Sequence, residues 1–121
     1  MATFTKKKLL GSTDGMGIKV TGTSTAATVT VHTCYTTVTT AGLFDEIWLY
    51  ANNTSSSAVK LTLEWGTATA ADGNIELTIA AESGLVLVVP GLILQNSKVV
   101  KAFAATADVI LLTGYVNAIT A

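Results

Sequence analysis

Short runs of strand-forming residues, separated by turn residues, recur along this chain from residue 16 onward. Their spacing of about 8–12 residues is typical of a β-sandwich or a β-barrel. No segment sustains the apolar i, i+3, i+4, i+7 spacing of an amphipathic helix over three turns. The 21 threonines and 12 valines favour the same fold class, because β-branched side chains fit a pleated sheet and lose rotamer freedom in a helix. The sequence therefore predicts an all-β protein.

Turn residues such as Asp72-Gly73 and Pro90-Gly91 separate eight segments that have the composition of strands. We expect strands at residues 16–21, 28–38, 44–51, 58–65, 74–79, 85–89, 99–103 and 109–116. Such strands predict an antiparallel β-sandwich of the jelly-roll type, and an immunoglobulin-like strand order is the alternative. Residues 1–15 contain three lysines and a Gly/Ser/Thr/Asp cluster. We therefore expect an extended N-terminal arm, followed by a single sandwich domain at residues 16–121.

Two of the expected strands alternate cleanly between apolar and other residues. At residues 58–65, Val59, Leu61 and Leu63 point to one side, and polar side chains point to the other. Residues 74–79 show the same alternation. Because successive side chains point to opposite faces of a strand, each of these strands should have one face in the core and one in water.

Three other segments, at residues 44–51, 85–89 and 109–116, carry large apolar side chains on both sides. Helices packed on a parallel sheet would cover such strands, but the sequence predicts no helices. We infer that one sheet face packs against further copies of this chain or against a partner protein. The alternative is that the N-terminal arm, or a strand that crosses from the second sheet, covers this face.

The expected energy of that contact is large. The side chains that we expect at subunit or partner contacts are Trp48, Tyr50, Val86, Val88, Leu112 and Val116. Each one moved out of water contributes roughly 1.5–3 kcal/mol. Leaving all of them exposed would therefore forgo on the order of 10 kcal/mol, which is comparable to the stability of a whole domain.

The charge composition argues against a nucleic-acid partner, and the short apolar stretches argue against a segment that spans a membrane. They make up only 12% of the chain, with seven lysines, no arginine and a net charge of −1. Phosphate recognition relies on arginine and on a positive field, so we expect no nucleic-acid binding. The longest apolar stretch, residues 85–94, is interrupted by Pro90-Gly91 and is much shorter than the ~20 residues that span a bilayer. We expect a soluble protein that is not exported by a signal peptide.

A run of three lysines, Lys6, Lys7 and Lys8, lies in the expected arm. Such a run is most often a solvated segment. Its functional interpretation is an arm that lies on an acidic surface of a partner, and we include these lysines among the expected contact residues.

His32 and Cys34 are the only histidine and the only cysteine, and they lie on one face of an expected strand. A His–Cys nucleophile or a metal site is conceivable from this pair. A zinc site needs three or four ligands, however, and the chain has no other Cys or His. We interpret the pair as a hydrogen-bonded strand histidine and a small buried thiol, and we expect no metal and no cofactor.

The carboxylates give no catalytic constellation either. Asp45 and Glu46 are adjacent in a strand and face opposite sides, so we expect them to flank a turn or to pair with a lysine. Glu64 and Glu76 could meet across the hairpin that turns at Asp72-Gly73, but a glycosidase also needs a sugar-lined cleft. The residues therefore predict no enzymatic activity and no catalytic site.

Several segments resemble short virion proteins that tailed bacteriophages encode among their head genes. The resemblance covers nearly the whole chain, and it rests on KKLLGSTDGMGIKV (residues 7–20), FDEIWLYANN (44–53), LTLEWG (61–66), VVPGLIL (88–94), VKAFAATA (100–107) and GYVNAI (114–119). These motifs are strand and turn signatures without an active site. Arginines that relatives carry near Met16 and Ala118 are missing here, so no charge-based role is expected at those places.

The resemblance implies a capsid decoration, or cement, protein. Such a protein is a β-sandwich, often a homotrimer, that is fixed to the outer surface of the capsid over junctions between capsomers. The implied partners are further copies of the chain and the major capsid protein, and the chain would be made in the host cytoplasm. Two other functions stay open: a tail or neck component of the virion, and a carbohydrate-binding module that stacks sugars on Trp and Tyr side chains.

Overall fold

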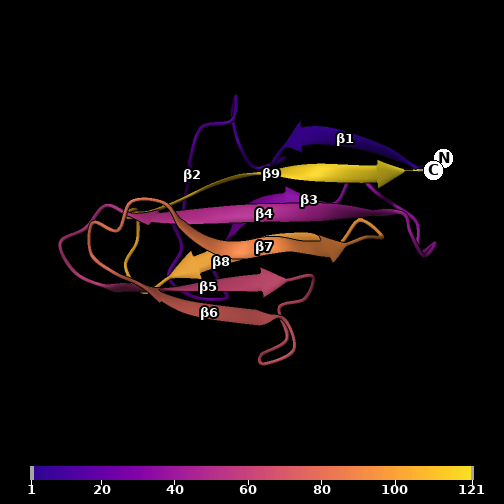
Figure 1. Cartoon of the computed structure of the whole chain (residues 1–121). Helices are drawn as coiled ribbons and strands as arrows, with labels where there is room; N and C mark the ends of the chain where they lie inside the picture. The colour runs from indigo at the N-terminus through magenta and orange to yellow at the C-terminus, as the bar shows by residue number, and fades with distance from the viewer. Residues whose placement is uncertain (1, 121) are drawn as a thin grey trace.

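The computed structural model describes residues 2–120, which form two antiparallel β-sheets packed face to face (Figure 1). The strands are β1 (Thr3–Lys8), β2 (Ile18–Lys19), β3 (Val29–Thr33), β4 (Phe44–Asn53), β5 (Val59–Trp65), β6 (Asn74–Ile79), β7 (Val86–Leu94), β8 (Val99–Ala104) and β9 (Ile110–Thr120). The five-stranded sheet has the order β1-β9-β4-β7, with β2 also paired to β9, and the four-stranded sheet has the order β3-β8-β5-β6. The predicted all-β sandwich is confirmed.

The strand pairing is nested, so that strands of the first half of the chain pair with strands of the second half. β5 pairs with β6, β4 with β7, β3 with β8, and both β1 and β2 with β9. Pairing of β4 with β9 and of β5 with β8 completes the two sheets. The chain thus forms one long hairpin that is wrapped into two layers, which is the strand order of a jelly roll.

Two predicted segments are longer than the strands found there: β3 ends at Thr33 instead of residue 38, and residues 16–21 contain only the short β2. Strand β7, in contrast, is longer than predicted. It was expected to end at residue 89, but it continues through Pro90 and Gly91 to Leu94. Proline is tolerated there because β7 is an edge strand and the β4–β7 register shifts beside it. Gly91 has φ +77°, a conformation that favours glycine. The expected turn is therefore an irregularity within a strand.

The N-terminal segment is also different from the expected arm. Residues 3–8 form β1, which pairs along β9 at the edge of the five-stranded sheet (Figure 1). Leu9 is buried in the core, and the N–H of Gly11 donates to the carbonyl of Val31 at 2.9 Å. The prediction of a separate arm is wrong over these residues, because backbone hydrogen bonds to β9 hold a segment that has no apolar periodicity. Met1 lies outside the described residues.

The core lies between the inner faces of the two sheets. In β5, Val59, Leu61 and Leu63 are buried and Lys60 is exposed, as the alternation predicted. The prediction of a face in water is wrong for Thr62 and Glu64, which are each only 3% exposed. In β4, Ile47 and Leu49 are completely buried. Among residues 2–120, no helix is long and apolar enough to cross a membrane.

Candidate functional site

The three strands with apolar residues on both sides are neighbours. Strands β9, β4 and β7 lie side by side in the five-stranded sheet (Figure 1). In β4 every second residue is completely or almost completely buried, and the residues between them are half-buried on the outer side. The strands that the sequence marked as two-sided therefore share one outer face, which is the candidate functional site.

Cross-strand register places the large side chains of this face in adjacent rows. Trp48 lies between Tyr115 of β9 and Pro90 of β7, and Tyr50 lies opposite Leu87 of β7. The rings of Trp48 and Tyr115 stack, with centroids 6.2 Å apart and an interplanar angle of 14°. We call the outer surface formed by Trp48, Tyr50, Leu87, Pro90, Ile93 and Tyr115 the apolar face.

A carboxylate fixes the indole of Trp48 in this face. Oε1 of Glu46 accepts hydrogen bonds from Nε1 of Trp48 at 2.8 Å and from Nδ2 of Asn117 at 3.1 Å. These two hydrogen bonds, that of Trp48 first, lower the pKa of Glu46 below its ordinary value. The ammonium group of Lys6 lies 4.3 Å from the centroid of the Tyr115 ring. The charged groups of Glu46 and Lys6 are thus partnered within the chain, and apolar surface remains for contact with another molecule.

Gly91 provides the space that the indole needs. A Cβ at this position would lie 2.9 Å from Cζ2 of Trp48. Since real Cβ atoms essentially never approach so closely, a larger residue would displace the ring. The irregularity of β7 at Pro90-Gly91 therefore shapes the apolar face.

Strand β7 carries two of the exposed large apolar side chains of this sheet, and Phe4 at the β1 edge is a further one, at 67% exposed. Leu87 is 44% exposed and Ile93 is 52% exposed, and Leu85, just before the strand, is 67% exposed. Neither Leu87 nor Ile93 was among the expected contact residues. Alternation along residues 85–89 showed two apolar sides but gave no sign of which side faces the solvent, and the extension of β7 to Ile93 was not predicted.

The other expected contact residues lie in or against the core. Leu112 and Val116 are completely buried inside the chain, so their side chains cannot contact another chain. This corrects the expectation for β9, whose outward residues include Tyr115 instead. Val86 and Val88 are partly buried and pack against the core. Of the apolar contact residues expected from the sequence, Trp48 and Tyr50 are those that lie on the apolar face.

Each lysine of the N-terminal run has a partner within the chain. Lys6 lies over Tyr115, Nζ of Lys7 lies 4.1 Å from the centroid of the Tyr35 ring, and Nζ of Lys8 donates to the carbonyl of Ser12 at 3.0 Å. Lys6 and Lys8 remain exposed at the edge of the sheet. The lysines thus project from a strand of the sheet, not from a free arm.

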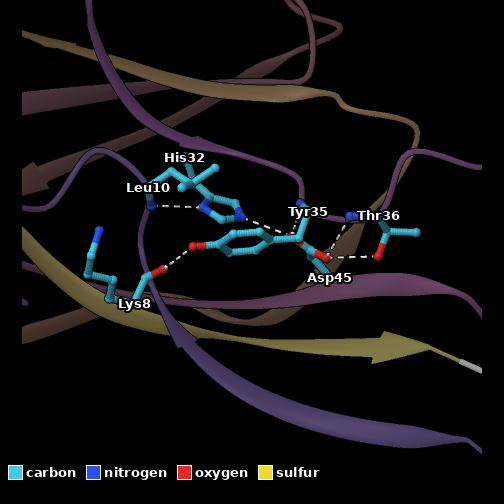
Figure 2. Close-up of polar contacts among 6 residues, drawn as sticks. All are labelled: Lys8, Leu10, His32, Tyr35, Thr36 and Asp45. Atoms are coloured by element: carbon cyan, nitrogen blue, oxygen red, sulfur yellow. Dashed lines mark hydrogen bonds and ion pairs between the residues drawn. The ribbon is translucent and has the colours of Figure 1, made fainter.

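A second polar cluster lies inside the sandwich, where His32 of β3 meets Asp45 of β4 (Figure 2). The backbone N–H of Leu10 donates to Nδ1 of His32 at 3.1 Å, so Nε2 carries the ring proton and donates to Oδ2 of Asp45 at 2.9 Å. Asp45 also accepts from the N–H groups of Tyr35 and Thr36 and from the Thr36 hydroxyl. Asp45 was expected to flank a turn or to pair with a lysine, so the structure corrects that prediction.

The surroundings of Asp45 act on its pKa in opposite directions. Burial alone would raise the pKa of this carboxyl group. The hydrogen bonds from His32, Tyr35 and Thr36 outweigh burial and lower the pKa below its ordinary value. The cluster therefore favours an ionised carboxylate at Asp45, and it joins β3, β4 and the segment after β1.

The same cluster brings Cys34 close to His32 and Asp45, with the potential ligand atoms within 4.8 Å of one another. Burial, together with the negative charge of Asp45, raises the pKa of the Cys34 thiol to about 12. A metal ligand must be a thiolate, and both imidazole nitrogens and the carboxylate are already engaged in hydrogen bonds. The donor set does not fit a metal ion, and the cluster is a structural one.

Comparisons of the chain with protein-family models, with curated proteins and with solved structures find no match. The function is therefore argued from the residues and geometry of the chain itself.

Proposed function

We propose that this chain is a non-enzymatic structural protein of a virion, of the capsid decoration type, which associates through the apolar face. The observation that carries the proposal is the row of large apolar and aromatic side chains that cross-strand pairing places on the outer face of β4, β7 and β9, with Leu87 and Ile93 about half exposed. Contiguous exposed apolar surface on a small domain is typical of a protein–protein contact. The resemblance of the sequence to short phage head proteins supports the same function.

The edges of the five-stranded sheet favour contact through its face. The β1 edge carries Lys6, Lys7 and Lys8, and the β7 edge contains Pro90 and the irregular residue Gly91. Lysine, proline and bulges at an edge hinder the pairing of another strand. Association by extension of this sheet is therefore disfavoured, and the apolar face is the surface left for a partner.

The proposed partners are further copies of this chain and the major capsid protein, at the outer surface of the capsid. A decoration protein that binds the assembled shell more tightly than free subunits stabilises the shell through linkage. An oligomer presents several shell contacts at once, which raises the effective affinity of weak individual contacts. A tail or neck component would use the same apolar face and would differ in its docking site.

The apolar face gives less support to a carbohydrate-binding module. Trp48 and Tyr115 stack on each other, and the indole N–H of Trp48 is bonded to Glu46. Their rings are thus partly occupied within the chain, whereas sugar stacking needs free ring faces.

Two measurements on the purified chain test the proposal. Size-exclusion chromatography with light scattering should give the mass of a defined oligomer. Co-sedimentation with phage heads that lack this protein should then recover the oligomer in the pellet, and the heads should resist heating better once it is bound. A stable monomer that does not sediment with heads contradicts the proposal, and an oligomer that binds only purified tails favours the tail component.

A further inference from the structure

The outer face of the four-stranded sheet, on the opposite side of the sandwich from the apolar face, contains two neighbouring hollows. One has a volume of about 260 Å³ and the other about 310 Å³. Glu64 of β5 and Ala68 line both of them. Because they share these residues, the two hollows adjoin each other, and each is close to the lower end of the range of about 300–1,000 Å³ typical of small-molecule sites. We call the pair of hollows the groove.

Glu64 is an unusual residue for the outer face of a sheet. It is only 3% exposed, although its cross-strand neighbour Lys101 is exposed. The loop between β2 and β3 covers it, and the hydroxyl of Thr25 in that loop donates to Oε2 of Glu64 at 2.6 Å. Within residues 2–120, this is the one hydrogen bond that its carboxylate receives, and no lysine lies within ion-pair distance.

The remaining carboxylate oxygen, Oε1, has no hydrogen-bond partner among the described residues, but it keeps contact with solvent, since no fully buried polar side-chain atom of residues 2–120 lacks a partner. Glu64 lines both hollows, so its accessible surface is available to a molecule bound there. A ligand that donates hydrogen bonds to Oε1 would supply what the chain itself does not.

The other lining groups limit the chemistry of that ligand. Lys98 and Lys101 line the first hollow beside Glu64, and Asn74 and Phe103 line the second. A metal cation is disfavoured because Glu64 is the one carboxylate of the groove and two ammonium groups lie near it. A phosphate or another simple anion is disfavoured by the carboxylate of Glu64 at the centre.

A neutral, polyhydroxylated molecule fits this mixture of groups. Its hydroxyl groups can donate to Glu64 and accept from the lysines and from the amide of Asn74. The hydroxyl groups of Thr23, Ser24, Thr67 and Ser97 offer further hydrogen bonds along the groove. The ring of Phe103 offers an apolar surface for the C–H groups of a sugar ring. We infer that this groove binds a carbohydrate chain, with Glu64 as its central acceptor.

This inference is independent of the proposed assembly function. The groove lies on the other sheet, so it stays accessible when the apolar face is covered by another chain. It also differs from the carbohydrate module considered from the sequence, which relied on Trp and Tyr side chains that stack sugars, because neither residue type lines this groove.

The test is a titration of the isotopically labelled full chain, followed by NMR, with maltohexaose, cellohexaose, mannohexaose and chitohexaose. At least one of these oligosaccharides should shift the backbone signals of Thr67, Asn74, Lys101 and Phe103 in a saturable way. Glu64→Gln keeps the size of the side chain but removes its charge, and it should weaken binding by about tenfold or more. Glu76→Gln is the matched control, since Glu76 lies on the same sheet outside the groove, and its affinity should equal that of the wild type.

Lys101→Ala provides a second variant, because Lys101 is exposed and its replacement leaves the core intact; it should also weaken binding. Three results would overturn the inference: no oligosaccharide shifts the groove signals, Glu64→Gln binds as tightly as the wild type, or calcium chloride or inorganic phosphate alone produces the same shifts. Each of these results leaves the oligomer mass and head binding, which test the proposed function, unaffected.

Discussion

The outer face of the five-stranded sheet carries Trp48, Tyr50 and Tyr115 in adjacent cross-strand positions, whereas the outer face of the four-stranded sheet carries an ion pair between Lys60 and Glu76. The inner faces of both sheets are apolar and form one core. The two outer faces thus differ in composition: the first is rich in aromatic and apolar side chains, and the second carries paired charges, which is why we propose that only the first contacts another protein.

This difference is visible in the sequence as well as in the structure. β5 and β6 alternate cleanly, and they lie in the four-stranded sheet. β4, β7 and β9 are apolar on both sides, and they lie together in the five-stranded sheet. Alternation along a strand therefore reports what each sheet packs against on both of its sides.

The largest effect is expected from charges placed on the apolar face. The double variant Leu87→Lys/Ile93→Lys replaces two exposed apolar side chains of β7. If each contributes roughly 1.5–3 kcal/mol to a contact, association should weaken by about 100-fold or more. Light scattering across a dilution series should show a monomer where the wild type is an oligomer.

The matched control for this variant changes the other outer face. Thr30→Lys/Thr78→Lys introduces the same charges at exposed positions of β3 and β6. Its oligomer mass should equal that of the wild type. If both double variants dissociate equally, the two outer faces do not differ in the way proposed here.

Leu112→Ala sharpens the distinction between face and core. Leu112 is completely buried, so its truncation should lower the free energy of unfolding by about 2–5 kcal/mol through lost burial and a residual cavity. Urea denaturation at a fixed protein concentration measures this loss. The folded variant should still form the wild-type oligomer. Dissociation of Leu112→Ala without a loss of stability would instead restore Leu112 as a contact residue.

The case of Leu112 shows what the sequence can predict about the site. Alternation showed that residues 109–116 have two apolar sides, but it does not say which side faces the core. The buried side is decided by how the two sheets pack on each other. β9 lies between β1 and β4 in its sheet, and the side of β9 that carries Leu112 faces the core. The sequence thus identified the sheet that carries the apolar face and some of its residues, including Trp48 and Tyr50.

Other features depend on contacts between distant residues and could not be read from local patterns. β1 is held by backbone pairing with β9, which leaves no apolar signature. The pair His32–Asp45 joins two strands, and Glu64 is buried by a loop around Thr25. Strand segments and the sandwich were predictable because they follow from composition and periodicity, whereas these contacts follow from the nested strand order.

Lowering the pH should reduce the stability of the fold through two carboxyl groups of β4. Asp45 and Glu46 are adjacent, so one faces the core and the other the outer side of the sheet. The pKa of each carboxyl group is lowered in the folded chain. A lowered folded-state pKa stabilises the fold at pH values above the ordinary carboxyl pKa of about 4, and this contribution is lost as the pH falls through the folded-state pKa. The urea midpoint should therefore decrease as the pH is lowered from 6 to the acidic range of about 3.

Asp45→Asn tests which carboxylate dominates this pH dependence. The variant removes the negative charge and replaces one of the two acceptor oxygens by an NH2 donor, so some donors among His32, Tyr35 and Thr36 lose their acceptor. It should be less stable than the wild type at neutral pH and should lose less stability on acidification. Asp14→Asn, at an exposed turn, is the matched control and should retain the wild-type pH profile. An Asp45→Asn profile as steep as that of the wild type would assign the pH dependence to other groups.

The smallest effect is expected on the outer face of the four-stranded sheet. Nζ of Lys60 lies 2.6 Å from Oε1 of Glu76, but the side chains are 54% and 48% exposed. Solvent screens such a pair, so Lys60→Gln should change the free energy of unfolding by less than about 1 kcal/mol. It should also leave the oligomer mass unchanged, because this face is expected to remain in water. A change in oligomer mass for Lys60→Gln would mean that other chains contact both outer faces, and the asymmetry of the sandwich would then no longer identify the assembly surface.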